Sequence, residues 1–334
     1  MSGKPTIHVI GTGGTISGVG SSATGAVYES GRVGASELVA EVGSLSQVTN
    51  IKTENLFATG SENLGPVEWR ILARRIEELT ASSDIDGVVV THGTDTLEEA
   101  SFFLDLVCKP SKPVVLTAAM RPATALSADG PANLYQAILA AASPQLNGHG
   151  ILVVMNGKVI PGWQAIKTDS AALESFCAYP GGIIGYISGE RIILSGESCT
   201  FPLSGMFSDH LKKEGKLPLV RVIFLRGGFE EVLLEDLINN DCKGVVIAGF
   251  GAGTLPNTVV NRIAKMERPE CVIVVSSRVQ RVMVMSETMT QIEGWSSIPS
   301  GFLNPQKSAL LLSLALEDGL QTLEIAGFFK KLYG

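Results

Sequence analysis

The sequence predicts an α/β protein with a larger N-terminal domain, built on a mostly parallel sheet with helices on both faces, and a smaller C-terminal α/β domain. Three observations support this prediction. Short β-branched runs alternate with amphipathic segments, the pattern of parallel strands joined by helical crossovers. The 334 residues exceed the size at which one core stops growing. Hydrophobic residues make up 45% of the chain and charged residues 18%, which is typical of a globular protein.

Apolar runs that end in turn residues predict the strands of the N-terminal half, and apolar positions three or four residues apart predict its helices. In the segment 66–79, Val67, Ile71, Leu72, Ile76 and Leu79 are expected to share one buried face. Thr96 and Glu99 have the spacing of a capping box before the helix 97–107. The predicted strands are 7–10, 48–57, 88–90, 114–117 and 151–155, and the predicted helices are 33–42, 66–79, 97–107 and 132–142.

The pattern changes after residue 155, where a loop over 161–172 carries Lys167 and a hairpin is expected over 181–194. The segment 195–217 lacks periodicity and is interpreted as a linker, so the domains are predicted as 1–194 and 218–334. The predicted elements of the second domain are strands at 220–225, 245–248 and 272–275 and helices at 231–239, 258–266 and 308–316.

Charge and composition favour a small-molecule ligand. The formal net charge is −7, and no run of Lys and Arg is longer than a pair, which argues against a nucleic-acid or membrane partner. No window reaches the roughly 18 apolar residues of a spanning helix. Five scattered cysteines form no C-x-x-C pair and are interpreted as core thiols. With no apolar leader before residue 7, we expect a cytoplasmic protein, or a periplasmic one if a signal was removed.

Two hydroxyl-rich turns follow predicted strands. The run IGTGGTISG delivers Thr15 just after a glycine turn, and THGTDT delivers Thr94 and Asp95. Ligands of open parallel sheets bind outside the carboxyl ends of the strands, where the strand order reverses. If the two strands are neighbours, both turns face one cleft.

A threonine hydroxyl needs a base within hydrogen-bond reach before it acts as a nucleophile. The candidates are Tyr28, on a Gly/Ser-rich segment over 17–32 that we call the lid, and Lys167, if it reaches Thr94 with Asp95 orienting it. Backbone N–H groups around Thr15 are candidates for holding an oxyanion, which suits acyl transfer from an amide. Singly, each of these residues also fits an ordinary turn, cap or surface position, and His92 is interpreted as a packing residue. No P-loop, H-E-x-x-H or G-x-S-x-G motif is present.

Together the two turns resemble the signature segments of the bacterial-type L-asparaginases, closest to the type II branch with a Gly/Ser-rich lid. The resemblance continues in order along almost the whole chain, through AAMRPATALSADGPANLYQA, GILVVMNG, IKTDS, GFGAG, SSRV and LNPQKS. It implies hydrolysis of L-asparagine to L-aspartate and ammonia through a β-acyl-threonine intermediate, without cofactor or metal.

The resemblance also implies roles for individual residues. Thr15 stands at the position of the family's nucleophile, Tyr28 at that of its activating lid tyrosine, and Thr94, Asp95 and Lys167 at those of its second catalytic group. The implied substrate-binding residues are Gly14, Ser61, Glu62, Thr94, Asp95, Ala119 and Glu287. Ser61 and Glu62 would hold the α-carboxylate and the α-ammonium, an arrangement that suits an amino acid.

The family resemblance further implies a homotetramer of close dimers, each site being completed by a neighbour's C-terminal domain. Thr254 replaces an Asn of many members, and 280–292 departs from the usual pattern, so Glu287 and then Glu293 are the candidates for the acidic residue that reaches the partner's site. Glu62 stands where many relatives have Gln, which leaves glutaminase side activity open. The alternative functions are an amino-acid-binding or sensing protein without turnover and a tRNA-dependent amidotransferase relative. The latter requires an N-terminal module, whereas the signature begins at residue 7.

Overall fold

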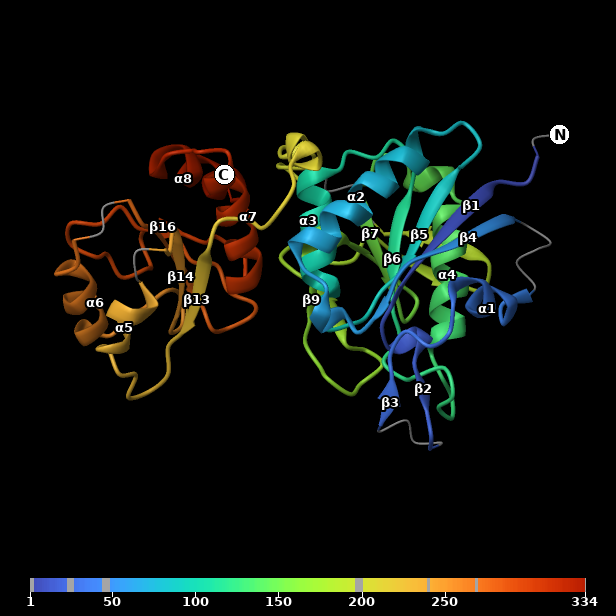
Figure 1. The fold of residues 1–334 in the computed structure, drawn as a ribbon, viewed down its shortest axis with the longest axis horizontal. Helices are drawn as coiled ribbons and strands as arrows, with labels where there is room; N and C mark the ends of the chain where they lie inside the picture. Colours follow the sequence, from blue (N-terminus) through green and yellow to red (C-terminus); the bar gives the residue numbers. More distant parts are fainter. Residues whose placement is uncertain are drawn as a thin grey trace. The chain divides into compact units, whose positions relative to one another are not determined.

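An eight-stranded sheet lies at the centre of the N-terminal part of this computed structural model (Figure 1). The structure describes residues 3–22, 27–43, 49–195, 201–238, 241–267 and 270–333, and it divides the chain into two units, Met1–Glu214 and Gly215–Gly334. In sheet order the strands are β12 (Arg191–Leu194), β11 (Gly185–Ser188), β8 (Lys158–Pro161), β7 (Ile151–Met155), β6 (Val114–Thr117), β5 (Gly87–Thr91), β1 (Thr6–Gly13) and β4 (Asn50–Thr59).

The strand order reverses at β1. From β1 the chain passes to the edge strand β4 and then returns across β1 to β5, and the ladders β4–β1–β5–β6–β7 are all parallel. β8, β11 and β12 extend the sheet with antiparallel ladders. The mostly parallel sheet predicted from the sequence is therefore confirmed, and β1 and β5 are the neighbours on either side of its switch point.

Helices cover both faces of the sheet (Figure 1). Alternate residues of β1 such as Ile7 and Val9 belong to a buried cluster that includes α1 (Ala35–Ala40) and α4 (Gly130–Ala141). On the other face lie α2 (Pro66–Ala81) and α3 (Leu97–Val107). Strands buried on both faces explain the continuous apolar runs of the sequence.

Two local predictions about α2 and α3 are wrong. Ile71 was expected on the buried face of α2 but is 40% exposed, because the buried stripe is centred on Trp69, Leu72 and Ile76. The capping box of α3 does not form, since the Thr96 hydroxyl donates to the Ser61 carbonyl at 2.8 Å instead of capping the helix. The helix bounds of 97–107 are nevertheless as predicted.

Several short elements of the first unit have no counterpart in the sequence prediction. The lid, expected to be irregular, contains the hairpin of β2 (Val19–Gly20) and β3 (Tyr28–Glu29), while its residues 23–26 lie outside the described part. The loop around Lys167 forms β9 (Ala165–Lys167), paired with β10 (Phe176–Ala178). The remaining short elements are 3₁₀ turns: η1 (Thr15–Ser17), η3 (Ser61–Asn63), η4 (Pro144–Leu146), η5 (Gly162–Gln164) and η6 (Ser208–Lys212).

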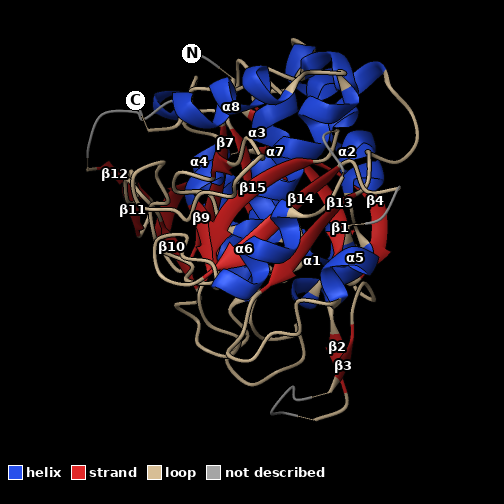
Figure 2. Cartoon of the chain, turned by 90° about the vertical axis from the view of Figure 1, so that its left-hand side faces the viewer, coloured by secondary structure: helices blue, strands red, loops and turns tan. Residues whose placement is uncertain are grey.

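The second unit contains a parallel four-stranded sheet of β13 (Val220–Phe224), β14 (Gly244–Gly249), β15 (Val272–Ser277) and β16 (Ile298–Pro299). Figure 2 shows α5 (Leu233–Leu237) and α6 (Asn257–Ala264) in front of it, and α7 (Pro305–Glu317) packs on its strands as well. The three long strands were predicted. The helix expected over 231–239 is shorter, with residue 239 outside the described part, and α8 (Thr322–Lys331) was not predicted.

The segment after β12 was interpreted as a linker over 195–217, of which 196–200 lie outside the described residues, together with Cys199. Its described part packs on α3, where the Gly205 and Phe207 amides donate to the Asp105 and Leu106 carbonyls at 2.9 Å each. Within the described ranges, no helix is both long and apolar enough to cross a membrane.

Candidate active site

The turns that follow β1 and β5 touch each other through two glycines. A Cβ placed on Gly14 would lie 2.4 Å from the Gly93 Cα, and one on Gly93 would lie 2.6 Å from the Ser61 Oγ. Gly14 also has a φ of 80°, which disfavours a side chain. The residues that follow these glycines, Thr15 and Thr94, are therefore held at one place on the carboxyl edge of the sheet.

Tyr28 reaches Thr15 from the lid. The Thr15 Oγ1 lies 2.7 Å from the Tyr28 OH, a distance at which either oxygen can donate. Thr15 is 7% exposed, in η1, whereas Tyr28 is 38% exposed. The ring lies over Gly18, where a Cβ would be 2.7 Å from Tyr28 Cδ2. Because Gly18 has no side chain, the phenol of Tyr28 can approach Thr15.

Hydrogen bonds anchor the lid at its base and at its β2 strand. The Ser17 carbonyl accepts from the amides of Arg32 at 2.9 Å and Val33 at 3.0 Å, which closes the base of the loop. At the β2 strand, the Gly20 N–H donates to the Thr124 Oγ1 at 2.8 Å, and that hydroxyl donates back to the Gly20 carbonyl at 3.1 Å. The position of Tyr28 is thus fixed by the same backbone that carries Thr15 and by the loop after β6.

Lys167 joins Thr94 and Asp95. Its Nζ donates to the Thr94 Oγ1 at 2.9 Å and to the Asp95 Oδ1 at 2.6 Å. The Lys167 side chain is 17% exposed and the Asp95 side chain 64% exposed. The sequence left open whether Lys167 reaches Thr94, and the structure brings them together.

The Lys167 backbone makes a contact that the sequence did not predict. Its N–H donates to the Glu98 Oε2 at 2.6 Å, and Glu98 is only 3% exposed. Glu98 follows Asp95 by three residues and is one of three charged residues on the helix 97–107, with Glu99 and Asp105. Without knowledge of which strand lies beside that helix, the sequence could not assign its partner.

Ser61 and Glu62 begin η3, the turn after β4. Ser61 is buried, and its Oγ and carbonyl accept from the Thr96 amide at 3.4 Å and the Thr96 hydroxyl at 2.8 Å. Glu62 is exposed, and its Oε1 accepts a hydrogen bond from the side-chain Nδ2 of Asn63 at 3.0 Å. Ser61 therefore lies beside the contact between Gly14 and Gly93, with the Glu62 carboxylate next to it in the chain.

Two further predicted binding residues, Gly14 and Ala119, lie in turns at the same edge of the sheet. The Gly14 N–H donates to the Thr59 carbonyl at 2.8 Å, and its carbonyl accepts from the Ser17 Oγ at 3.0 Å. The Gly14 N–H is consequently not available for an oxyanion. Ala119 is completely buried, in the turn whose next two amides, those of Met120 and Arg121, donate to the Asp129 carboxylate.

Glu287 lies in the second unit and Thr15 in the first. Glu287 is exposed, and its negative charge adds to burial in raising the pKa of Tyr333. Thr254 is exposed and closes a turn with Phe250, each accepting the other's amide at 2.8 and 2.9 Å.

His92 is completely buried between Thr91 and Gly93. Burial lowers the pKa of its imidazole to about 4, and a hydrogen bond to the Gly93 carbonyl opposes this shift. Because a carbonyl only accepts, Nδ1 carries the proton, at 2.9 Å, and Nε2 has no hydrogen-bond partner among the described residues. His92 is therefore a neutral packing residue. Among the described residues no group of His, Cys, Asp or Glu could hold a metal ion.

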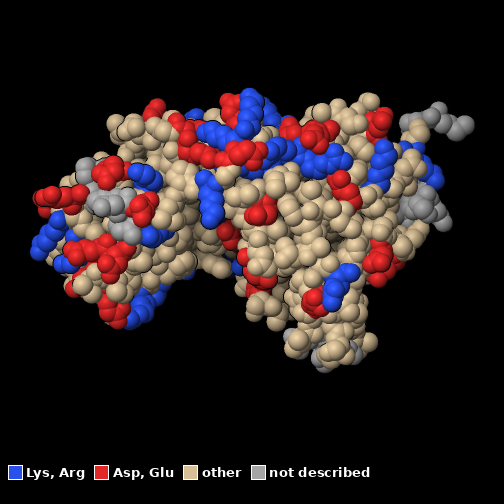
Figure 3. All heavy atoms as spheres, in the orientation of Figure 1, with Lys and Arg blue, Asp and Glu red and all other residues tan. Residues whose placement is uncertain are grey.

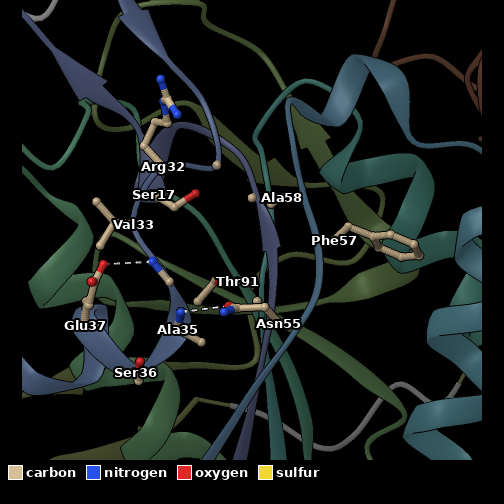
Figure 4. Close-up of a pocket in the computed structure, with 14 residues that line it drawn as sticks. Ser17, Arg32, Val33, Ala35, Ser36, Glu37, Asn55, Phe57, Ala58 and Thr91 are labelled. Atoms are coloured by element: carbon tan, nitrogen blue, oxygen red, sulfur yellow. Dashed lines mark hydrogen bonds between the residues drawn. The ribbon is translucent and has the colours of Figure 1, made fainter.

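A pocket of about 300 Å³ lies behind the turn that carries Thr15, between β1, β4 and α1 (Figure 4). Asn55 accepts from the Ala35 amide at 2.9 Å across it, and Glu37 accepts from the Gly34 amide at 3.1 Å. Ser17 from the base of the lid lines this pocket, whereas none of the predicted catalytic side chains does.

Charge on the surface is mixed. Figure 3 shows acidic and basic side chains side by side on the visible face of each unit. The arginines of α2 illustrate this, since Arg74 pairs with Glu214 at 2.6 Å and Arg75 with Glu54 at 2.8 Å. Such a surface offers no long basic stripe for a nucleic acid on the face shown.

Comparisons with known proteins cover the whole chain. Residues 6–199 match the family profile described as "Asparaginase, N-terminal", and residues 219–329 match "Glutaminase/Asparaginase C-terminal domain". The probable periplasmic L-asparaginase of Haemophilus influenzae is 36% identical over 328 residues, covering 98% of this chain and 93% of that protein. L-asparaginase 2 of Escherichia coli is 36% identical over 327 residues, with the same coverage.

A solved structure agrees with the sequence relatives. The crystal structure of a probable cytoplasmic L-asparaginase from Campylobacter jejuni superposes with a TM-score of 0.89 at 33% identity, covering 98% of this chain and all of that one. The resemblance inferred from the two hydroxyl-rich turns is confirmed, because both profiles match in order and the relatives align over nearly their full length. The chain belongs to the asparaginase/glutaminase family.

Proposed function

We propose that this protein hydrolyses the side-chain amide of L-asparagine to L-aspartate and ammonia, with Thr15 as the nucleophile. The observation that carries the proposal is the pair of threonine hydroxyls at the switch point, each hydrogen-bonded to a different side chain that can take part in proton transfer. Thr15 has Tyr28 at 2.7 Å, and Thr94 has Lys167 at 2.9 Å. Membership of the family supports the same reaction.

In the first step the Thr15 Oγ1 attacks the carboxamide carbon while its proton passes to the Tyr28 oxygen, and the phenol gives up its own hydroxyl proton toward the amide nitrogen. The tetrahedral intermediate collapses when the C–N bond breaks, and the nitrogen takes up that proton and leaves as ammonia. The product is an ester between Thr15 and the β-carbonyl of aspartate. Since Tyr28 belongs to the lid, the proton transfer requires the lid strands to be in the observed place.

In the second step water attacks the acyl carbon and gives up a proton, the ester C–O bond breaks, and the leaving Thr15 Oγ1 takes up that proton as aspartate forms. Thr94 is placed to act here, because the Lys167 ammonium donates to its hydroxyl oxygen and Asp95 holds that ammonium from the other side. The group polarises Thr94 without needing a metal ion.

The α-groups of the substrate have complementary partners. Asp95 uses Oδ1 for Lys167, so Oδ2 is left for the α-ammonium together with the exposed Glu62 carboxylate. The Ser61 Oγ accepts from the Thr96 amide, which leaves its proton for the α-carboxylate. Glutamine is longer by one methylene, a difference worth about 1–3 kcal/mol to a binding pocket. We therefore infer glutaminase activity as a weaker side reaction, measured by comparing kcat/KM for the two amides.

Thr15→Ala and Thr94→Ala test the assignment. Each should lower ammonia release from L-asparagine by about three orders of magnitude or more, because each removes a group that acts on the reacting carbon. Thr80→Ala is a matched control, since Thr80 is also buried but its hydroxyl bonds the Ile76 and Glu77 carbonyls within α2. Full activity in either site variant contradicts the proposal. Calorimetry that shows L-asparagine binding to the wild type without ammonia release would favour a binding protein instead.

We further propose a homotetramer in which Glu287 of a neighbouring subunit completes each site. The support is the exposed position of Glu287 in the second unit, together with the paired N- and C-terminal profiles. A cytoplasmic location is proposed because the five scattered cysteines form no C-x-x-C pair and the similar Campylobacter jejuni protein is named a probable cytoplasmic L-asparaginase. Fractionation of the native cells tests the location, and light scattering tests the tetramer.

A further inference from the structure

Helix α3 carries a stripe of three buried polar side chains. Glu98, Ser101 and Asp105 are 3%, 0% and 1% exposed, and their spacing places them on one face of the helix. A buried carboxylate or hydroxyl lowers the free energy of unfolding unless it finds hydrogen-bond partners. The hydrogen-bond partners of these three side chains therefore indicate their structural role.

All three side chains bond backbone atoms of the segment 162–167 that leads to Lys167. Asp105 accepts from the Trp163 amide at 3.1 Å, and Ser101 donates to the Gly162 carbonyl at 3.0 Å. Glu98 accepts from the Lys167 amide at 2.6 Å. The segment runs along α3 toward its N-terminus and ends beside the turn that carries Thr94 and Asp95.

Lys167 needs such a partner because, within the described part of the chain, its strand has a sheet neighbour on one side only. β9 pairs with β10 in a two-stranded sheet, where Lys167 lies opposite Phe176. The next amide, that of Thr168, donates to the Ser175 carbonyl at 2.8 Å, as the ladder requires. The Lys167 amide faces the other way, and the Glu98 carboxylate takes the place of a missing strand.

Lys167 is consequently attached to one short stretch of chain at two points. Its Nζ bonds Thr94 and Asp95, and its N–H bonds Glu98, within five consecutive residues. The hydrogen bond to Glu98 fixes the position of the Lys167 backbone, and the bonds to Thr94 and Asp95 fix the position of its Nζ.

We propose that Glu98 is a positioning residue, which holds the backbone of Lys167 so that its ammonium meets the Thr94 hydroxyl. This inference deepens the proposed function and rests on it. Glu98 acts through Lys167 and touches neither of the groups assigned to the α-carboxylate and α-ammonium. Its loss should therefore lower kcat and leave KM for L-asparagine unchanged.

The test uses two replacements that differ in reach and in charge. Glu98→Asp keeps the charge but withdraws the carboxylate by one methylene, whereas Glu98→Gln keeps the reach and an acceptor oxygen but loses the charge. We expect kcat to fall about tenfold in Glu98→Asp and to stay within about threefold in Glu98→Gln, with KM within about twofold in both. Ser101→Ala is the matched control, because it removes a buried bond of the same stripe without touching Lys167.

Hydrogen exchange provides a readout that does not depend on turnover. The peptide that contains the Lys167 amide should exchange faster in Glu98→Asp than in the wild type and at the wild-type rate in Ser101→Ala. In a Lys167→Met background, Glu98→Asp should produce no further loss of kcat, because the group it positions is gone.

The proposal is overturned if Glu98→Asp keeps the wild-type kcat, if Glu98→Gln loses as much as Glu98→Asp, or if Ser101→Ala lowers kcat equally. Each result would show that reach to the Lys167 amide is not what matters. If the wild type releases no ammonia from L-asparagine, the proposed function fails, while the exchange comparison still decides whether Glu98 holds Lys167.

Discussion

At the scale of single residues, the Tyr28 hydroxyl offers a direct test of the first catalytic step. Tyr28→Phe removes the oxygen 2.7 Å from Thr15 and leaves the ring over Gly18. We expect kcat for L-asparagine to fall about 10²- to 10⁴-fold, the range of one general acid–base group. The measurement is steady-state ammonia release. Tyr186→Phe is the control, because Tyr186 is 49% exposed on β11. Equal activity of Tyr28→Phe and the wild type would contradict the role of the lid.

His92 predicts how stability depends on pH. Burial lowers its pKa from 6.5 to about 4 in the folded state, so between these pH values the unfolded chain binds more protons. The free energy of unfolding should therefore decrease as pH falls from 6.5 to 4, by about 3 kcal/mol from this group, with no further loss below. His92→Gln removes the titration and should show a smaller decrease in thermal denaturation at pH 4, 5 and 6.5. An equal decrease in both proteins would contradict this.

How far the sequence could predict the site depends on the range of each contact. Thr15 and Thr94 were proposed because hydroxyl residues that follow predicted strands are visible in the sequence, whereas Lys167 was placed on a loop and its reach to Thr94 was left open. Glu98 was missed because its partner is an amide 69 positions away, and amides carry no sequence signal. The wrong capping box has the same origin, since the Thr96 hydroxyl bonds a carbonyl 35 positions away.

At the scale of elements, the contact between the turns after β1 and β5 makes Gly14 irreplaceable. Gly14→Ala places a Cβ 2.4 Å from the Gly93 Cα, at a φ of 80°. Gly148 also has a positive φ, 78°, and a Cβ placed on it would meet nothing within 4 Å. We expect Gly148→Ala to cost about 1 kcal/mol of unfolding free energy and to keep its activity, and Gly14→Ala to lose activity as well as stability. Urea denaturation and ammonia release measure both. Similar behaviour of the two variants would show that strain, and not the close approach, matters.

The elements that were predicted well are those whose local pattern and tertiary environment agree. The strands at 114–117 and 151–155 and the helix over 97–107 are buried and apolar, and they were found with the predicted bounds. β9 and β16 were not predicted, because strands of two or three residues show no period. Ile71 was misplaced because the stripe of α2 includes Trp69, which the apolar pattern had not included.

At the scale of the whole molecule, the proposed assembly predicts complementation between inactive variants. Thr15→Ala lacks the nucleophile in the first unit, and Glu287→Gln lacks the carboxylate in the second. If a neighbour supplies Glu287, a tetramer mixed from both variants contains some sites with both groups intact. We expect mixing under subunit exchange to restore part of the ammonia release, measured against each variant exchanged with itself. No recovery, with exchange shown by mass spectrometry, would contradict a shared site.

The closed base of the lid has a consequence for how such proteins can diverge. Because the Ser17 carbonyl accepts hydrogen bonds from the Arg32 and Val33 amides, the loop leaves and rejoins the body at one point. The lid sequence can therefore change while the domain that carries Thr15 keeps its fold, provided that Tyr28 keeps its place. Selection can then change which amides are admitted without rebuilding the chemistry beneath.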